Sequence, residues 1–440
     1  MSTRISIAVV YAGVVLEASA LLFGCSGNAS SSSFAPAAST QQGTQTGSNV
    51  QSKGDVRHYE LVTLDSLGGS VSFAINIDDR GQVSGTSFLS GNTILHAQIW
   101  ESPPRTTDLG TLGGSNSAVF QYNHGSGGHF VGWSETAEID PNNENFCGFG
   151  TSHVCLGFSW QRGKMTSLPT LGGMNDHVND VNKRGQMVGA AETSTPDPSC
   201  IAPHVLDYLD VIWQPNGNIR KLSPYTGDTV SYAYTITQSG EAVVGNSGSC
   251  AAPATHALLW RSRTSPINLG SLGGSVNVAL DINNHSQIIG NSDLSGNTVT
   301  HTFLWQRGTM TDLGTLPGDT DSFAGGINDE GQVVLESSDA SGNCRGYLWQ
   351  NGSMTDLNTL ISPHKNLNVL FGANINDSGE IVGATVNARG VERAILLAPR
   401  ESGDVLPDGA SVPKVTLPER MRLRNPHGGL WDLRKSAIPR

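Results

Sequence analysis

The sequence contains few charged residues and no stretch with the apolar spacing of a helix. Charged side chains make up 15% of the 440 residues, and 38 acids against 26 bases give a formal net charge of −12. A chain with this charge is repelled by a nucleic-acid backbone, so we expect no nucleic-acid partner. Because no run keeps a 3.6-residue apolar period over a useful length, a mainly helical fold is excluded.

The sequence also lacks the spacings that are typical of metal sites. It has six cysteines and 12 histidines, but no CxxC or HxxxH pair and no DxDxDG loop. Asn and Asp do recur at fixed places, which could suggest calcium, but they also have the chemistry that tight turns require. We therefore predict no metal and no cofactor.

What the sequence has instead is one unit repeated seven times. The distance between equivalent positions is 45 residues from Asn283 to Asn328 and 59 residues at its largest, from Asn123 to Asn182. A period of this length indicates a solenoid, a propeller or an array. The turn position falls at Asp78, Asn123, Asn182, Thr237, Asn283, Asn328 and Asn376, and a Trp follows at Trp100, Trp160, Trp213, Trp260, Trp305 and Trp349.

Each unit contains four short runs that are typical of strands. In the fifth copy we expect strands at 279–283, 286–290, 301–305 and 309–316, because these runs carry β-branched or aromatic residues between Gly, Asn and Ser clusters. Turns such as NDEG at 328–331 suit a type I turn that a left-handed glycine closes. The unit is therefore predicted to be a four-stranded antiparallel sheet.

The two ends of the repeat region complement each other. The seventh copy stops at Pro399 without its fourth run, while residues 57–64 resemble that run and precede the first full copy. A terminal strand that completes the last blade closes a circular propeller. We predict an all-β, seven-bladed β-propeller over residues 57–399, with the small residues of each first strand at the crowded axis.

The segments outside the repeats have other compositions. Residues 1–24 predict a signal peptide of the lipoprotein type, and LLFGC places Cys25 where a lipid would be attached. Residues 25–56 are rich in Ser, Thr and Gln and predict a flexible tether. Residues 400–440 predict a mostly disordered tail. We expect an exported monomer, at the outer membrane, on the cell surface or secreted, that touches the membrane only through its lipid.

The remaining cysteines favour an oxidising compartment. Cys147 and Cys155 bracket a short loop, and Cys200 and Cys250 occupy similar places in adjacent copies. Two disulfides and a spare thiol at Cys344 are the simplest arrangement.

The repeat resembles that of the HAF-repeat family of extracellular proteins. The sequences HAQIW (96–100), HALLW (256–260), HTFLW (301–305) and MTDLGTL (310–316) carry the resemblance, which covers about 340 residues. Four copies lack the His. The resemblance implies a secreted repeat protein and supplies no catalytic residue. We expect His96, His256 and His301 to be structural hydrogen-bonding residues, and the Trp series to be core.

Two copies carry insertions between their second and third strands. The distance from the second strand to the Trp is 28 residues in copy 2 (132–160) and 24 in copy 3 (189–213), compared with 15 in copy 4 (245–260). Loops on a rigid scaffold commonly carry binding residues, although neutral loop growth explains them equally well. The candidate binding residues are Trp133, Glu135, Glu138, Asp140, Phe146, Phe149, His204, Asp207 and Tyr208.

These observations favour a non-catalytic surface propeller that binds a glycan, a peptide or a neighbouring surface protein. One alternative is a propeller-type lyase or glycosidase acting on polysaccharide, for which His177 and Asp180 are the best candidate residues. A purely structural envelope protein is a second alternative. We expect the two insertions to form one raised ridge, because they lie on adjacent blades and emerge on the same face.

The lipid anchor can be tested directly. Replacing Cys25 by Ala should abolish fatty-acid labelling and release the protein from the membrane fraction, because the acceptor thiol is lost. Labelling and membrane association that persist in the Cys25→Ala variant would refute lipid attachment at this residue.

Overall fold

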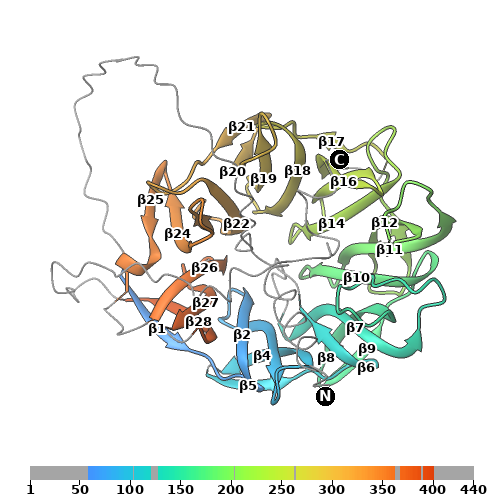
Figure 1. The fold of residues 1–440 in the computed structure, drawn as a ribbon, viewed down its shortest axis with the longest axis horizontal. Coiled ribbons are helices and arrows are strands. Elements are labelled where there is room, and N and C mark those ends of the chain that lie inside the picture. The colour runs from blue at the N-terminus through green and yellow to red at the C-terminus, as the bar shows by residue number, and fades with distance from the viewer. Residues whose placement is uncertain are drawn as a thin grey trace, which may run out of the picture.

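The computed structural model describes residues 58–102, 104–119, 127–202, 204–261, 264–361, 367–387 and 390–400. The predicted signal peptide, tether and tail lie outside these ranges. The described chain forms seven sheets of four antiparallel strands arranged around a central axis (Figure 1), which confirms the predicted seven-bladed propeller. Among the described residues no helix is both long and apolar enough to cross a membrane.

Each blade runs from its first strand near the axis to its fourth at the outside. Blades 1 to 3 comprise β2 (Gly68–Ile77), β3 (Val83–Leu89), β4 (Leu95–Ser102), β5 (Arg105–Asp108); β6 (Gly113–Ala118), β7 (His129–Ile139), β8 (His153–Gln161), β9 (Lys164–Ser167); and β10 (Gly172–Val181), β11 (Met187–Pro196), β12 (Leu206–Trp213), β13 (Ile219–Lys221). Blades 4 to 6 comprise β14 (Val230–Ile236), β15 (Val243–Ser249), β16 (Ala252–Trp260), β17 (Ile267–Asn268); β18 (Gly273–Ile282), β19 (Ile288–Leu294), β20 (Thr300–Gln306), β21 (Thr309–Asp312); and β22 (Asp321–Ile327), β23 (Val333–Ser338), β24 (Cys344–Gln350), β25 (Ser353–Asp356), followed by the short 3₁₀ helix η1 (Leu357–Thr359).

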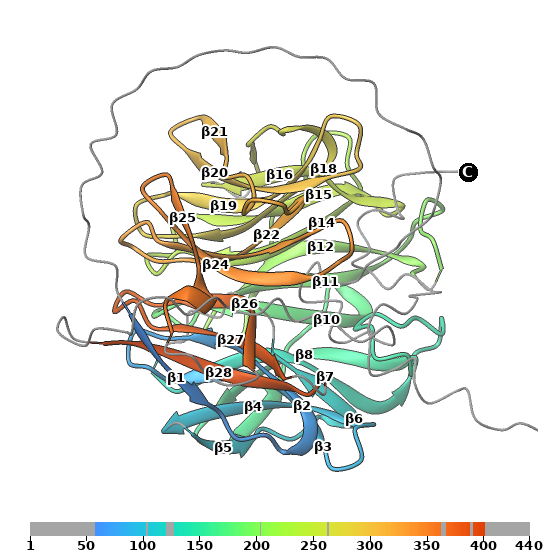
Figure 2. The same cartoon turned by 60° about the vertical axis from the view of Figure 1, so that its left-hand side comes forward.

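Blade 7 is built from both ends of the repeat region. It contains β26 (Leu367–Ile375), β27 (Ile381–Asn387) and β28 (Glu392–Pro399), and its outer strand is β1 (Tyr59–Thr63). β1 runs antiparallel to β28, with Tyr59 opposite Pro399 and Thr63 opposite Ile395, and the two strands lie side by side in both views (Figures 1 and 2). The predicted closure of the ring by residues 57–64 is therefore confirmed.

The first strands begin earlier than the sequence predicts. In blade 5, β18 begins at Gly273 instead of residue 279, and β21 ends at Asp312 instead of residue 316. The Leu-Gly-Gly segment is thus a turn into the next blade. In blade 3, Gly172 has a φ of 109°, and a Cβ on Gly173 would lie 2.4 Å from the Cβ of Glu192. Both glycines are needed for the new strand to fold onto its neighbour.

Side chains at the first hairpin turn join neighbouring blades at the axis. The Nδ2 of Asn328 donates to the carbonyl of Asn376 at 3.0 Å, and Asn283 donates to Asn328 in the same way at 2.9 Å. Asn376 makes the same bond from blade 7 to blade 1, to the carbonyl of Asp78 at 3.0 Å. Because the Oδ1 of Asn328 also accepts from the backbone of Gln332, each such Asn holds its own turn and the next blade together.

Four of the six Trp residues that were predicted to be core are buried, whereas Trp305 and Trp349 are half-buried at the edge of their clusters. Trp100, Trp213 and Trp260 are at most 2% exposed. Each donates its indole N–H to a backbone carbonyl of the segment that precedes its own blade, as Trp213 does to Pro169 at 2.9 Å. These three rings are core residues with a satisfied polar atom.

The pairing of β1 with β28, which we call the seam, leads to a prediction about stability. Tyr59 is fully buried in β1, whereas Glu60 on the same strand is exposed. We expect Tyr59→Ala to lower the free energy of unfolding by about 3–5 kcal/mol, as for other large aromatic truncations in a core. Glu60→Ala is the matched control and should unfold like the parent in a urea titration. If the two variants have equal midpoints, β1 does not contribute to the fold.

Candidate functional site: the ridge on blades 2 and 3

The insertions of blades 2 and 3 lengthen strands as well as loops. β7 has 11 residues and β11 has 10, compared with seven in β15 and β19. Three predicted loop residues, Trp133, Glu135 and Glu138, therefore lie on β7, while Asp207 and Tyr208 lie on β12. The loops themselves span residues 140–152 and 197–205. We refer to these two loops, with the ends of β7, β11 and β12 that carry them, as the ridge.

Two disulfides fix the ridge. Cys147 is bonded to Cys155, which closes the blade-2 loop onto β8, and Cys200 is bonded to Cys250, which joins blade 3 to blade 4. Both predicted pairs are confirmed. The spare thiol predicted at Cys344 is wrong, because no cysteine in the described part of the chain is free. That prediction counted the thiols after setting Cys25, which lies outside the described residues, aside for a lipid.

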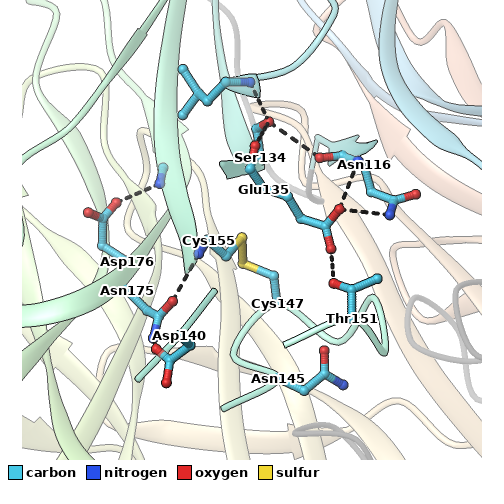
Figure 3. The surroundings of a disulfide bond; sticks show 12 residues. Asn116, Ser134, Glu135, Asp140, Asn145, Cys147, Thr151, Cys155, Asn175 and Asp176 are labelled. Carbon is cyan, nitrogen blue, oxygen red and sulfur yellow. Dashed lines mark hydrogen bonds between the residues drawn. A yellow bond between two sulfur atoms is a disulfide. The ribbon is translucent and has the colours of Figure 1, made fainter. Parts of the chain in front are cut away.

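A buried polar network supports the blade-2 loop (Figure 3). The Oε2 of Glu135 accepts from both the backbone N–H and the side-chain amide of Asn116, and its Oε1 accepts from the hydroxyl of Thr151. Asn175 on β10 accepts from the N–H of Cys155 at 2.9 Å and donates to the Oδ2 of Asp140 at 2.8 Å. Loop, disulfide and inner strands are thus connected by side chains that are shielded from water.

Three carboxylates meet beneath the ridge. Asp140 begins the blade-2 loop and accepts from the N–H groups of Asn142 and Glu144. Glu144 accepts from the N–H of Val205 at 2.5 Å, which places the two insertions side by side, as the blade order predicts. Glu192, on β11, accepts from the side-chain amide of Asn175 at 2.9 Å. One carboxylate oxygen from each of Asp140, Glu144 and Glu192 lies within 4.8 Å of the others.

The electrostatics of these three groups are unfavourable as they stand. All three are at most 2% exposed, and none forms a salt bridge with a basic side chain of the described residues. Two like charges about 5 Å apart repel by about 3 kcal/mol at an effective dielectric constant of about 20. Burial, together with the charge of Glu144, raises the pKa of Glu192 to about 9. The cluster therefore requires a proton or a cation.

The aromatic residues of the ridge face inward. Phe146 packs against His177 on β10 and Tyr208 on β12, with ring centroids 5.3 and 6.1 Å apart. His177 is also stacked at 4.2 Å on Tyr232 of blade 4, and it touches Trp133. On the other side, Phe149 packs against the hydrophobic cluster of blades 1 and 7. The blade-2 loop thus spans the inner edges of several blades.

Burial divides the nine predicted binding residues. Glu135, Asp140, Phe146 and Tyr208 are buried, so they cannot contact a partner unless the ridge moves. Trp133, Phe149, His204 and Asp207 are half-buried, and Glu138 is exposed. The spacing of the copies located the insertions but did not show which side chains their loops enclose.

The ridge exposes several large apolar side chains that were not among the predicted binding residues. Exposed large apolar side chains are few in the described chain, and most of them are here. Ile139 is 62% exposed and Ile201 58%. Val205 and Met174, which lies near the start of β10, are each 37% exposed. The remaining one, Ile267, lies on the outer strand of blade 4. Sequence reasoning missed these residues because an isolated aliphatic residue in a loop gives no signal of its exposure.

Asp180 and His177, the two residues considered for catalysis, make contacts that stabilise the fold. Asp180 accepts from the N–H of Val181 and of Ile236 in the next blade. Asp281 makes the equivalent pair of bonds in blade 5, so Asp180 repeats a structural role. Burial lowers the pKa of His177 to about 3, and the aromatic rings around it leave the imidazole neutral and enclosed.

Two hollows elsewhere in the described chain are weaker candidates for a functional site. One, of about 600 Å³, opens between β1, β5 and β28 and includes Arg105 and Arg393. The other lies at the turn end of the axis. Its apolar lining comes from the last residues of five first strands, all at most 3% exposed: Ile77, Ile236, Ile282, Ile327 and Ile375.

The recurring histidines hold strands and blades together, as predicted. The Nδ1 of His301 contacts the carboxylate of Asp312 on β21 at 2.9 Å, and its Nε2 contacts the carbonyl of Thr320 in the next blade at 3.3 Å. His96 makes the same pair of contacts with Asp108 and Ser115. The hydrogen bond that His301 donates to the Asp312 carboxylate raises the pKa of His301.

Comparisons with known proteins give only distant similarities. Neither the protein-family models nor the curated proteins contain a match. Among solved structures, virginiamycin B lyase from Staphylococcus aureus is 11% identical, over 77% of this chain and 99% of its own, with a TM-score of 0.45. A puromycin-hydrolyzing peptidase from Mycobacterium tuberculosis is also 11% identical (TM-score 0.48), over 80% of this chain, which spans only 57% of the peptidase. Similarities as distant as these do not indicate a function for this chain.

The His301–Asp312 pair predicts a pH dependence. A histidine whose pKa is raised in the folded state stabilises the fold below its unfolded pKa of about 6.5, and this contribution is lost as pH rises through the folded value. We expect His301→Gln to lower stability by on the order of 1 kcal/mol at pH 5.5 and by less at pH 8.5. His285→Gln, at an exposed histidine, is the control. An equal loss at both pH values would show that the pair carries no charge.

Proposed function

We propose that this chain is an exported propeller that binds a protein or peptide partner, without catalysis, through the apolar surface of the ridge. The observation that carries the proposal is that four of the five exposed large apolar side chains of the described residues, Ile139, Met174, Ile201 and Val205, lie on the ridge or on the strand beside it. Contiguous exposed apolar surface on a monomer usually marks an interaction site.

The partner class follows from which side chains are exposed. Sugar rings are commonly recognised by exposed aromatic faces, but Phe146 and Tyr208 are enclosed in the ridge. Aliphatic side chains within a polar rim suit the apolar side chains of a polypeptide. A protein or peptide partner is therefore favoured over a glycan.

A fixed frame supports binding at this surface. The disulfides Cys147–Cys155 and Cys200–Cys250 and the bond from Val205 to Glu144 hold both loops in one arrangement. A pre-ordered surface loses less entropy on binding. Disulfides are also typical of proteins that fold in oxidising compartments, which supports the export part of the proposal, as do the resemblance to HAF repeats and the LLFGC segment ending at Cys25.

The alternative of a lyase or glycosidase receives less support. Its best candidate residues, His177 and Asp180, are buried and make contacts that stabilise the fold. In the described chain, the end of the axis where the first hairpin turns lie is lined largely by isoleucines. A purely structural envelope role would not require exposed Ile139 and Ile201, which carry a cost in solubility.

Site-specific photo-crosslinking tests the proposal. A photoreactive residue at Ile201 in the full chain should capture a defined protein in the native envelope, whereas the same group at Ile267, an equally apolar exposed position on blade 4, should not. With the captured partner purified, Ile139→Ser combined with Ile201→Ser should weaken binding at least tenfold, about 1.4 kcal/mol or more, and Ile267→Ser should leave it unchanged. Equal capture at both positions, or undiminished affinity in the double variant, would refute binding at the ridge.

A further inference from the structure

We propose that Asp140, Glu144 and Glu192 form a calcium site that locks the two insertions of the ridge together. The three carboxylates come from different parts of the fold. Asp140 and Glu144 lie on the blade-2 loop, and Glu192 lies on β11 of blade 3. The sequence analysis predicted no metal, because 48 residues separate Glu144 from Glu192 and no motif spacing joins them.

An unsatisfied atom points to a ligand in this cluster. Glu192 is fully buried, and its Oε2 accepts from Asn175, but its Oε1 has no hydrogen-bond partner. Buried polar atoms are rarely left in this state, and such an exception commonly indicates an ion or a water. A free carboxylate oxygen in a group of three carboxylates is a cation ligand rather than an anion ligand.

The geometry favours calcium over other cations. All three donors are carboxylate oxygens, which hard cations prefer, and the cluster contains no His or Cys that would favour zinc. Oxygens that lie within 4.8 Å of one another can share one ion. Ca²⁺ accepts the irregular ligand arrangement that two different strands and loops supply, whereas Mg²⁺ demands near-ideal octahedral geometry and retains several waters.

The blade-2 loop also has a suitable local arrangement. Oxygen-bearing side chains occur at alternate positions, Asp140, Asn142 and Glu144, and the Oδ1 of Asp140 turns the backbone by accepting from the next two of these residues. Alternating oxygen ligands in a tight loop are a common way to surround Ca²⁺. The loop thus brings its side-chain oxygens to the side that faces β11.

The position of the site defines what the ion would do. Glu144 already accepts from the backbone of Val205 and Leu206 in blade 3. An ion shared by Glu144 and Glu192 would offset the repulsion between the carboxylates and join the loops of two blades. The exposed Ile139 precedes Asp140 in sequence, and the exposed Val205 donates its backbone N–H to Glu144. Calcium would therefore fix the surface to which the partner is proposed to bind.

The test uses the full chain, stripped with EGTA and then titrated with CaCl₂. We expect a saturable rise in melting temperature and a calorimetric binding signal of one ion per chain, with MgCl₂ at equal concentration giving a much smaller shift. No calcium-dependent shift at millimolar concentration, or an equal shift with magnesium, would overturn the proposal. This measurement on the unaltered protein does not depend on any variant folding, and it is independent of whether a partner is found.

Two variants locate the site. Glu192→Gln should weaken calcium binding at least tenfold, because it replaces a carboxylate ligand by an amide. It should melt in EGTA at about the same temperature as the parent, because Gln has the same shape and keeps an oxygen that can accept from Asn175. Glu138→Gln removes an exposed charge from the neighbouring strand and should retain the full calcium response. A Glu192→Gln variant that binds calcium as tightly as the parent would exclude these ligands.

Discussion

Each blade of this propeller depends on its neighbour to satisfy part of its backbone. At the axis, Asn283, Asn328 and Asn376 each donate to a carbonyl of the following blade. Further out, hydroxyls such as that of Ser322 accept from the third strand of the preceding blade. Because these bonds go to backbone atoms, the neighbouring side chains are free to vary. This freedom explains why the His of the repeat is absent from several copies while the architecture persists.

The repeat was sufficient to predict the architecture because its signals are local. Turn glycines and strand composition depend on residues a few positions apart, and together with the missing fourth run after Pro399 they predicted seven blades and the closing strand. The two disulfides were predicted from the loop that Cys147 and Cys155 bracket and from the similar places of Cys200 and Cys250 in adjacent copies. Strand ends were less accurate, since Gly273 and its equivalents extend the first strand by packing against the second. That contact is set by tertiary packing, which a pattern in the sequence does not contain.

The burial of side chains in the ridge could not be predicted from the sequence. Comparing copies located the insertions, but inside them the usual distribution of side chains is reversed: Glu144 and Glu192 are enclosed, whereas Ile139 and Ile201 face solvent. Composition alone predicts the opposite, because carboxylates are normally solvated and aliphatic residues buried. The reversal becomes visible only when two loops from different blades are placed together, and it is what distinguishes the ridge from the rest of the described surface.

The pairing of β1 with β28 in blade 7 affects how the chain folds during its synthesis. Tyr59 and Leu61 in β1 are buried against residues near the far end of the domain, and Leu61 pairs with Leu397. A ribosome adds about 5–20 residues per second, so β1 emerges roughly 20–70 seconds before its partner strand exists. During this interval its apolar residues and open hydrogen-bonding edge are exposed. The aromatic ring of Tyr59, which is fully buried in the finished protein, therefore stays without its packing partners until almost the whole propeller has been synthesised.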